Sequence, residues 1–182
     1  AYDIGLANMI LNHITQKIGL NYDDNGMLAR KGNINNGMLE RLNQLSYYSL
    51  AFPKSTGYEW FVEKVVPIID ATKDTTENLL HTAVHHICKQ VALQIKMYAA
   101  KDQSTLFVTG GGALNPFMME LLQSKLSPTV SLVIPSKKLI EYKEALIFAL
   151  MGILRIEQEI NVLKTVTGAS KDSSSGVVYL PA

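Results

Sequence analysis

The chain has few cysteines, little net charge and no long apolar run, so it lacks the features that mark unusual classes of protein. Its 182 residues include one cysteine, Cys88, which excludes an internal disulfide framework. The formal net charge is +1 and no long run of Lys or Arg occurs, so we expect no nucleic acid partner. The longest apolar stretch, residues 145–154, is too short to span a bilayer, and we expect no membrane contact. The first residues form no signal-peptide pattern, which favours a cytoplasmic location.

The chain does contain enough apolar sequence for one domain or slightly more. Hydrophobic residues make up 47% and charged residues 18%, which is typical of a folded protein. The last long helix is apolar on much of its circumference, so we expect it to be deeply packed. Apolar spacing predicts helices over residues 3–19, 36–45, 60–69, 74–100, 117–126 and 141–160, and strands over 106–109, 130–134 and 177–180.

These elements predict a helix-rich α/β fold with a small sheet. The strand–helix–strand order over residues 106–134 predicts two parallel strands, with ligands at their carboxyl ends. Few strands are predicted for so many helices, and a sheet this small would be poorly covered. The first residue, Ala1, is not Met. Both observations suggest that the sequence is processed or belongs to a longer chain.

The most informative segment is LFVTGGGALNP, residues 106–116. An apolar strand ends in Gly110, Gly111 and Gly112, and Asn115 and Pro116 stand where a helix begins, as a preferred N-cap and first residue. Glycines allow a ligand to approach the backbone, and helix N-termini favour anions. The segment is neither a P-loop nor the dinucleotide pattern. Nucleotide or phosphate contact and a plain tight turn therefore both remain open on local sequence.

Other polar positions have a simple structural interpretation on local sequence, and Asp3 also has a functional one. Asp3, before the first predicted helix, is favoured as an N-cap, and its alternative is a general base. Glu144 lies within an apolar helical segment, where exposure at one edge is the simplest explanation. Residues 54–56 (KST) are expected to form a solvated turn. Asp74 and Glu77 resemble a capping box at the start of the longest helix.

The histidines and the cysteine are expected to be structural. His81 and His85 have the spacing of a helical zinc motif, but the general-base Glu of that motif is replaced by Thr82. We therefore expect structural or partly exposed roles for these histidines and for His86, and no metal site. Cys88 lies among apolar residues without an evident activating cation, so a buried, inert thiol is predicted.

Six short segments follow one another in an order that is highly specific in combination. They are YDIGLAN (residues 2–8), YDDNG (22–26), PKSTGYE (53–59), VTGGGALNP (108–116), KEALIFA (143–149) and VTGAS (166–170). Together they resemble the anhydro-N-acetylmuramic acid kinase family, sugar kinases of the actin-like, hexokinase and Hsp70 superfamily. The resemblance covers nearly the whole chain.

The resemblance implies the C-terminal lobe of an actin-like ATPase (ribonuclease H-like) fold over residues 1–182. It implies a cytoplasmic enzyme of murein recycling that uses ATP and Mg²⁺ to open 1,6-anhydro-N-acetylmuramic acid with water and phosphorylate it at the 6-oxygen. Asp3 matches the catalytic aspartate. Gly110, Gly111, Gly112 and Asn115 match the nucleotide-binding loop. Glu144 and Asn8 are expected on the sugar side.

The chain also departs from the family pattern. DIGLAN stands where the family usually has DTGPGN, and Tyr58 stands where Arg usually follows PKSTG. Nothing in the chain matches the N-terminal lobe with its phosphate loop, so we expect that lobe to be absent and the chain alone to be inactive. It would then need the missing lobe as a partner, and a homodimer is possible. The alternative is a degenerate, non-catalytic lobe that acts as a nucleotide-binding or interaction module.

Overall fold

The computed structural model describes residues 1–99 and 103–179. The chain divides into two compact units, one comprising residues 2–135 and the other residues 136–182 with Ala1. The strands and most of the helices belong to the first unit, and each unit is described by itself. The structure is thus the helix-rich α/β protein that the sequence predicts, with a small sheet.

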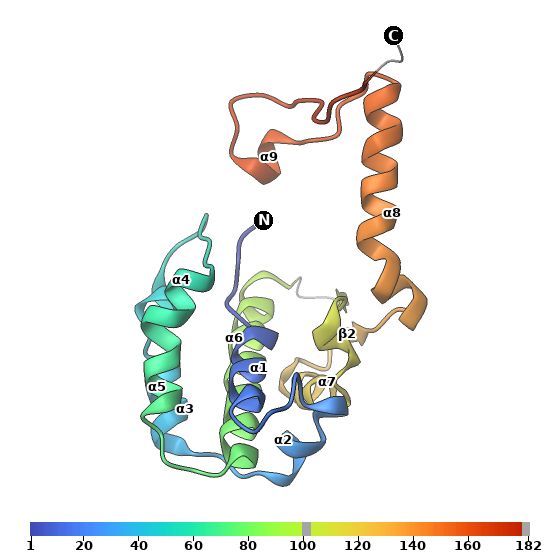
Figure 1. The fold of residues 1–182 in the computed structure, drawn as a ribbon. Coiled ribbons are helices and arrows are strands. Elements are labelled where there is room, and N and C mark those ends of the chain that lie inside the picture. The colour runs from blue at the N-terminus through green and yellow to red at the C-terminus, as the bar shows by residue number, and fades with distance from the viewer. Residues whose placement is uncertain (100–102, 180–182) are drawn as a thin grey trace. The chain divides into compact units, whose positions relative to one another are not determined.

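The first unit is organised around the longest helix, α6 (Thr76–Tyr98). Its side chains at positions 79, 80, 83, 84, 87 and 88 are buried, which gives one apolar stripe of helical period. In Figure 1, α6 runs through this unit beside α1 (Asn8–Gln16) and α2 (Met27–Lys31), and it also contacts α3 (Asn36–Asn43) and α7 (Pro116–Lys125). The core therefore lies along α6.

The sheet of the described residues has two parallel strands, β1 (Ser104–Phe107) and β2 (Val130–Val133). Ser104 lies opposite Val130, and Phe107 lies opposite Val133. Helix α7 connects the strands, so the predicted strand–helix–strand unit is confirmed. The predicted helix over residues 60–69 is also present, as α4 (Tyr58–Trp60), a π-helical turn over Phe61–Val65 and α5 (Val66–Asp70).

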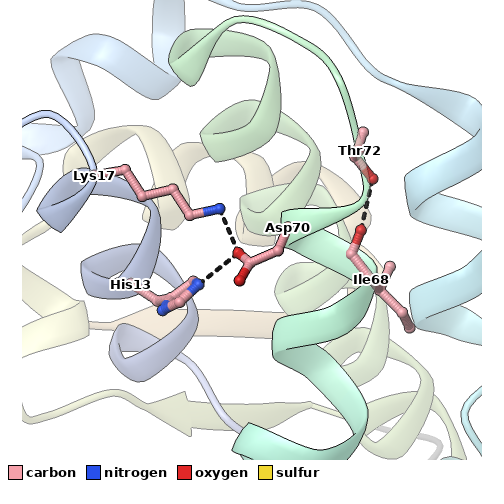
Figure 2. A network of polar contacts seen from close by, with 5 residues as sticks. All are labelled: His13, Lys17, Ile68, Asp70 and Thr72. Atoms are coloured by element: carbon pink, nitrogen blue, oxygen red, sulfur yellow. Dashed lines mark hydrogen bonds and ion pairs between the residues drawn. The ribbon is translucent and has the colours of Figure 1, made fainter.

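A polar contact joins α1 to the end of α5, as Figure 2 shows. One carboxylate oxygen of Asp70 lies 2.8 Å from His13 Nε2 and also pairs with Lys17 Nζ. Just after α5, the Thr72 hydroxyl donates to the Ile68 carbonyl oxygen, in the last turn of the helix, at 2.7 Å. Burial alone raises the pKa of Asp70, but the hydrogen bonds and charges of Lys17 and His13 outweigh it and lower the pKa. The pair of helices therefore carries an ionised aspartate at neutral pH.

Two predicted helix starts are wrong. Helix α1 begins at Asn8 and not at Asp3, because the Asp3 backbone is bound by Lys54 and Tyr47 instead of starting a helix. Helix α6 is capped by Thr75 and not by Asp74, since the Thr75 side chain accepts from the Asn78 N–H. The predicted end of this helix, residue 100, lies outside the described residues. Both helices begin later than predicted because side-chain and tertiary hydrogen bonds replace helical backbone hydrogen bonds at the predicted first residues.

The second unit contains α8 (Lys137–Ile156) and α9 (Lys164–Thr167), with an antiparallel bridge between Val162 and Ser173. The prediction that the apolar helix is deeply packed is wrong for this structure, because the short segments of its own unit offer little apolar surface. Its exposed side chains include Leu146, Ile147, Phe148, Leu150, Ile153 and Ile156.

The predicted last strand is wrong over residues 177–179, which form no strand, and residue 180 lies outside the described residues. Among the residues that the structure describes, no helix is both long and apolar enough to cross a membrane.

Candidate functional site

Asp3 is held by hydrogen bonds to four residues distant in sequence. Its N–H donates to the Lys54 carbonyl oxygen at 3.1 Å, and its own carbonyl oxygen accepts from the Tyr47 hydroxyl at 2.7 Å. The carboxylate oxygen Oδ2 accepts from Ser55 Oγ at 2.9 Å and from the Thr56 N–H at 3.0 Å. Asp3 itself is exposed. The chain thus presents a carboxylate whose orientation is fixed.

The two oxygens of this carboxylate have different surroundings. Both donors bind Oδ2, and among the described residues none binds Oδ1. The Thr56 N–H, and after it the Ser55 hydroxyl, stabilise the charged form and lower the pKa of Asp3. Asp3 is therefore ionised at neutral pH, with one oxygen held by the protein and the other open to a proton donor.

This geometry overturns two expectations from local sequence. Asp3 is not the N-cap of α1, because the cap position is Ala7 and α1 has no side-chain cap bond. The solvated turn expected over residues 54–56 is wrong as well, since Lys54, Ser55 and Thr56 all bind Asp3. The signal in the sequence was the two hydroxyl residues after Pro53, but local spacing does not show that they meet an aspartate 52 residues away.

The glycine loop lies against the start of α1. Gly110 has φ of +86°, a left-handed conformation that favours glycine, and a 3₁₀ turn over Gly111–Leu114 follows. A Cβ on Gly111 would come within 3.0 Å of Asn8 Nδ2, and one on Gly112 within 3.6 Å of Asn8 Oδ1. The structure therefore brings Asn8, an exposed residue, together with the two glycines.

Asn115 caps α7, as predicted. Its Oδ1 accepts from the Met118 N–H at 3.0 Å, and Pro116 is the first helical residue. The side chain is buried against Gly26, where a Cβ would lie 2.2 Å from Asn115 Oδ1. The observed contacts of Asn115 are therefore structural, and they connect the YDDNG turn to the glycine loop.

A cavity of about 430 Å³ opens beside this loop. Most of its lining is apolar, and it includes Ala7, Asn8, Ile87, Cys88, Val91, residues 106–113, Met118, Met119 and Leu122. Thr109 Oγ1 and Thr56 Oγ1 are buried without a hydrogen-bond partner among the described residues. Buried hydroxyls in native proteins usually pair with protein, water or ligand, so these two hydroxyls are candidates for a further hydrogen bond.

The remaining predicted residues fall outside this arrangement. Glu144 is exposed on α8, in the second unit. Cys88 is buried, which confirms that part of the prediction; its thiol donates to the Met118 carbonyl oxygen, and burial raises its pKa to about 12, which favours an inert thiol. His81 stacks on His85 and binds the Ala29 carbonyl oxygen, so its structural role is confirmed. Among the described residues, no group of three or more His, Cys, Asp or Glu is placed to hold a metal ion.

A family model and individual relatives that match this chain carry the same description. The family model described as anhydro-N-acetylmuramic acid kinase matches residues 1–181. Similar proteins of that name include one from Vibrio cholerae serotype O1, which is 35% identical over 99% of this chain and 50% of its own length. Others are from Aliivibrio fischeri, 35% identical over 98% of this chain and 49% of its own, and from Nitrosomonas europaea, 33% identical over the same shares.

The chain thus spans about half the length of the curated relatives that it matches. The matching family model covers nearly every residue, including Asp3, the glycine loop and the segment that holds Asp3. The chain belongs to the anhydro-N-acetylmuramic acid kinase family.

Proposed function

We propose that this chain is the C-terminal lobe of an actin-like sugar kinase, the part that carries the general base and one wall of the nucleotide site. The whole protein would use ATP to convert 1,6-anhydro-N-acetylmuramic acid into N-acetylmuramic acid 6-phosphate. Family membership supports a kinase of this kind, and the relatives are named for it. The observation that carries the proposal is the anchored, ionised carboxylate of Asp3 with its open Oδ1.

Asp3 is proposed as the base of the hydrolytic step. A water bound at Oδ1 gives its proton to the carboxylate while its oxygen attacks C1 of the anhydro sugar. The bond from C1 to the 6-oxygen breaks, and the freed 6-oxygen attacks the γ-phosphorus, with ADP as the leaving group. The bonds from Ser55 and Thr56 keep the carboxylate charged and aimed, so the water is held in an attacking position.

The glycine loop is proposed to face the nucleotide. Gly110, Gly111 and Gly112 lie at the carboxyl end of β1, where ligands of parallel sheets bind. Asn8 lies beside them and is proposed to reach the sugar, as is Glu144 from α8. Asn115, the N-cap of α7, is proposed to contact the nucleotide together with this loop.

Mg²⁺ is proposed as the companion of ATP, where it would neutralise charge on the phosphate oxygens. In such sites the ion is bound mainly through phosphates and one or two carboxylates. Among the described residues no group of three or more His, Cys, Asp or Glu could hold a metal ion by itself. Further metal and phosphate contacts are proposed to come from the part of the kinase that this chain does not span.

The test joins the chain to the half of the Vibrio cholerae relative that it does not match, placed ahead of Ala1. With ATP, Mg²⁺ and the anhydro sugar, ADP release should appear in the joined protein and not in the chain alone. Asp3→Asn should abolish it, whereas Glu40→Gln, an exposed carboxylate on α3, should leave it unchanged. Normal turnover by the chain alone would refute the proposal that it carries only one wall of the nucleotide site. A well-folded joined protein that binds ATP without turnover would instead support the non-catalytic alternative, in which Ile4 and Tyr58 mark a degenerate site.

A further inference from the structure

Tyr47 lies between the protein core and the backbone of Asp3. Its side chain is 4% exposed, yet its hydroxyl reaches the Asp3 carbonyl oxygen at 2.7 Å. Lys54 contacts it twice, since Nζ donates to the Tyr47 carbonyl oxygen at 3.1 Å and lies 4.7 Å from the centre of the ring. The Tyr47 ring also packs against Trp60, with ring centres 5.0 Å apart. Tyr47 is therefore a rigid donor whose position the fold determines.

The neighbouring Tyr48 faces a different partner. Its hydroxyl lies 2.8 Å from His86 Nε2, and His86 Nδ1 lies 2.9 Å from Asn43 Oδ1. Because Gln90 Nε2 also donates to that oxygen, it is an acceptor. His86 therefore donates through Nδ1, and its Nε2 accepts a hydrogen bond from the Tyr48 hydroxyl. The two adjacent tyrosines thus differ in their hydrogen bonds. The Tyr47 hydroxyl donates to the Asp3 backbone, whereas the Tyr48 hydroxyl binds the buried polar network and the Tyr48 ring lies beside Gly5, where an added Cβ would be 3.0 Å from it.

The Asp3 segment needs this support because it belongs to neither a helix nor a strand. Residues 2–6 lie in no helix or strand, so no helical or sheet hydrogen bonding fixes their position. The backbone of Asp3 is instead located by two bonds, one from its N–H to Lys54 and one from Tyr47 to its carbonyl oxygen. The carboxylate bonds to Ser55 and Thr56 depend on that placement.

We propose that Tyr47 is a positioning residue for Asp3, whose hydroxyl fixes the Asp3 backbone so that Oδ2 stays on its two donors and Oδ1 faces the reacting water. The proposal rests on the function proposed above for Asp3. Tyr47 is itself suited to the role, because burial, and then the charge of Asp3, raise the pKa of its hydroxyl and keep it a donor.

The test titrates the Asp3 carboxyl of the full chain by ¹³C NMR, with the signal assigned by its loss in Asp3→Asn. Tyr47→Phe removes one hydroxyl and should raise the pKa of Asp3 toward its ordinary value, because the bonds that stabilise the charged form lengthen. Tyr48→Phe removes the same group from the next residue and should leave the Asp3 titration unchanged. Lys54→Met keeps the Tyr47 hydroxyl but removes its two lysine contacts, and should raise the pKa less. If Tyr47→Phe folds poorly, the Asp3 titration is measured in Lys54→Met instead.

An Asp3 titration in Tyr47→Phe that superposes on that of the parent chain would overturn the proposal. So would equal changes in Tyr47→Phe and Tyr48→Phe, because these would report general loosening. In the joined kinase, Tyr47→Phe should lower kcat by about 10- to 100-fold and leave the KM for ATP unchanged, as expected when a catalytic group is misplaced. Full activity in Asp3→Asn would refute the proposed function, while the titration would still decide whether Tyr47 positions Asp3.

Discussion

Replacing Gly26 by alanine should unfold the first unit at a markedly lower urea concentration. Gly26 has φ of +67°, and a left-handed conformation costs a residue with a Cβ about 1–2 kcal/mol. The new Cβ would also lie 2.2 Å from Asn115 Oδ1 and 2.9 Å from Phe117 Cβ, so the cap of α7 must move. Loss of a cap costs about 0.5–2 kcal/mol. The two contributions give an expected loss of about 1.5–4 kcal/mol in the free energy of unfolding.

The measurement is urea unfolding followed by the fluorescence of Trp60, the single tryptophan of the chain, which belongs to this unit. Gly19→Ala is the matched control, because Gly19 has φ of +78° but nothing lies within 4 Å of its added Cβ. The control should lose only the backbone contribution, about 1–2 kcal/mol. Equal losses in the two variants would refute the argument that Gly26 is required by its contact with Asn115.

Two further predictions concern ionisable groups. Asp70→Asn should lower the free energy of unfolding by about 0.5–1 kcal/mol at pH 7, since the contact with Lys17 and His13 is partly exposed. The pKa of Asp70 is lowered in the folded state, so this contribution should be present above pH ~4 and disappear as the pH falls through the folded pKa, which urea titrations at pH 7 and pH 3 will show. Cys88 should not react with Ellman's reagent at pH 8 in the folded chain, because burial raises its pKa to about 12, and should react fully in urea. Stoichiometric labelling of the folded chain would contradict its burial.

Features that depend on neighbouring residues were predicted well from the sequence. The cap of α7 by Asn115 follows from side-chain chemistry over three residues, and the parallel pairing of β1 and β2 follows from the helix that connects them. The burial of Cys88 follows from its place in an apolar helical stripe. In each case local spacing contains the physical cause.

Features that depend on contacts between residues distant in sequence were not predicted. The environment of Asp3 is made by Tyr47, Ser55 and Thr56, which lie 44 to 53 residues away, and no local pattern distinguishes a cap from this arrangement. The exposure of α8 was missed for a related reason. An apolar helix surface predicts burial, but whether a covering surface exists is decided by other segments.

The unequal use of the Asp3 carboxylate has a consequence for inhibitor chemistry. Oδ2 already accepts two hydrogen bonds, and Oδ1 accepts none from the described residues. A guanidinium or amidine, which pairs with both oxygens of a carboxylate at once, would have to displace Ser55 or Thr56. A single ammonium group placed near the anomeric carbon of a sugar mimic needs only Oδ1. Under the function proposed for Asp3, amino-sugar mimics should therefore bind better than amidine-bearing sugars of the same shape.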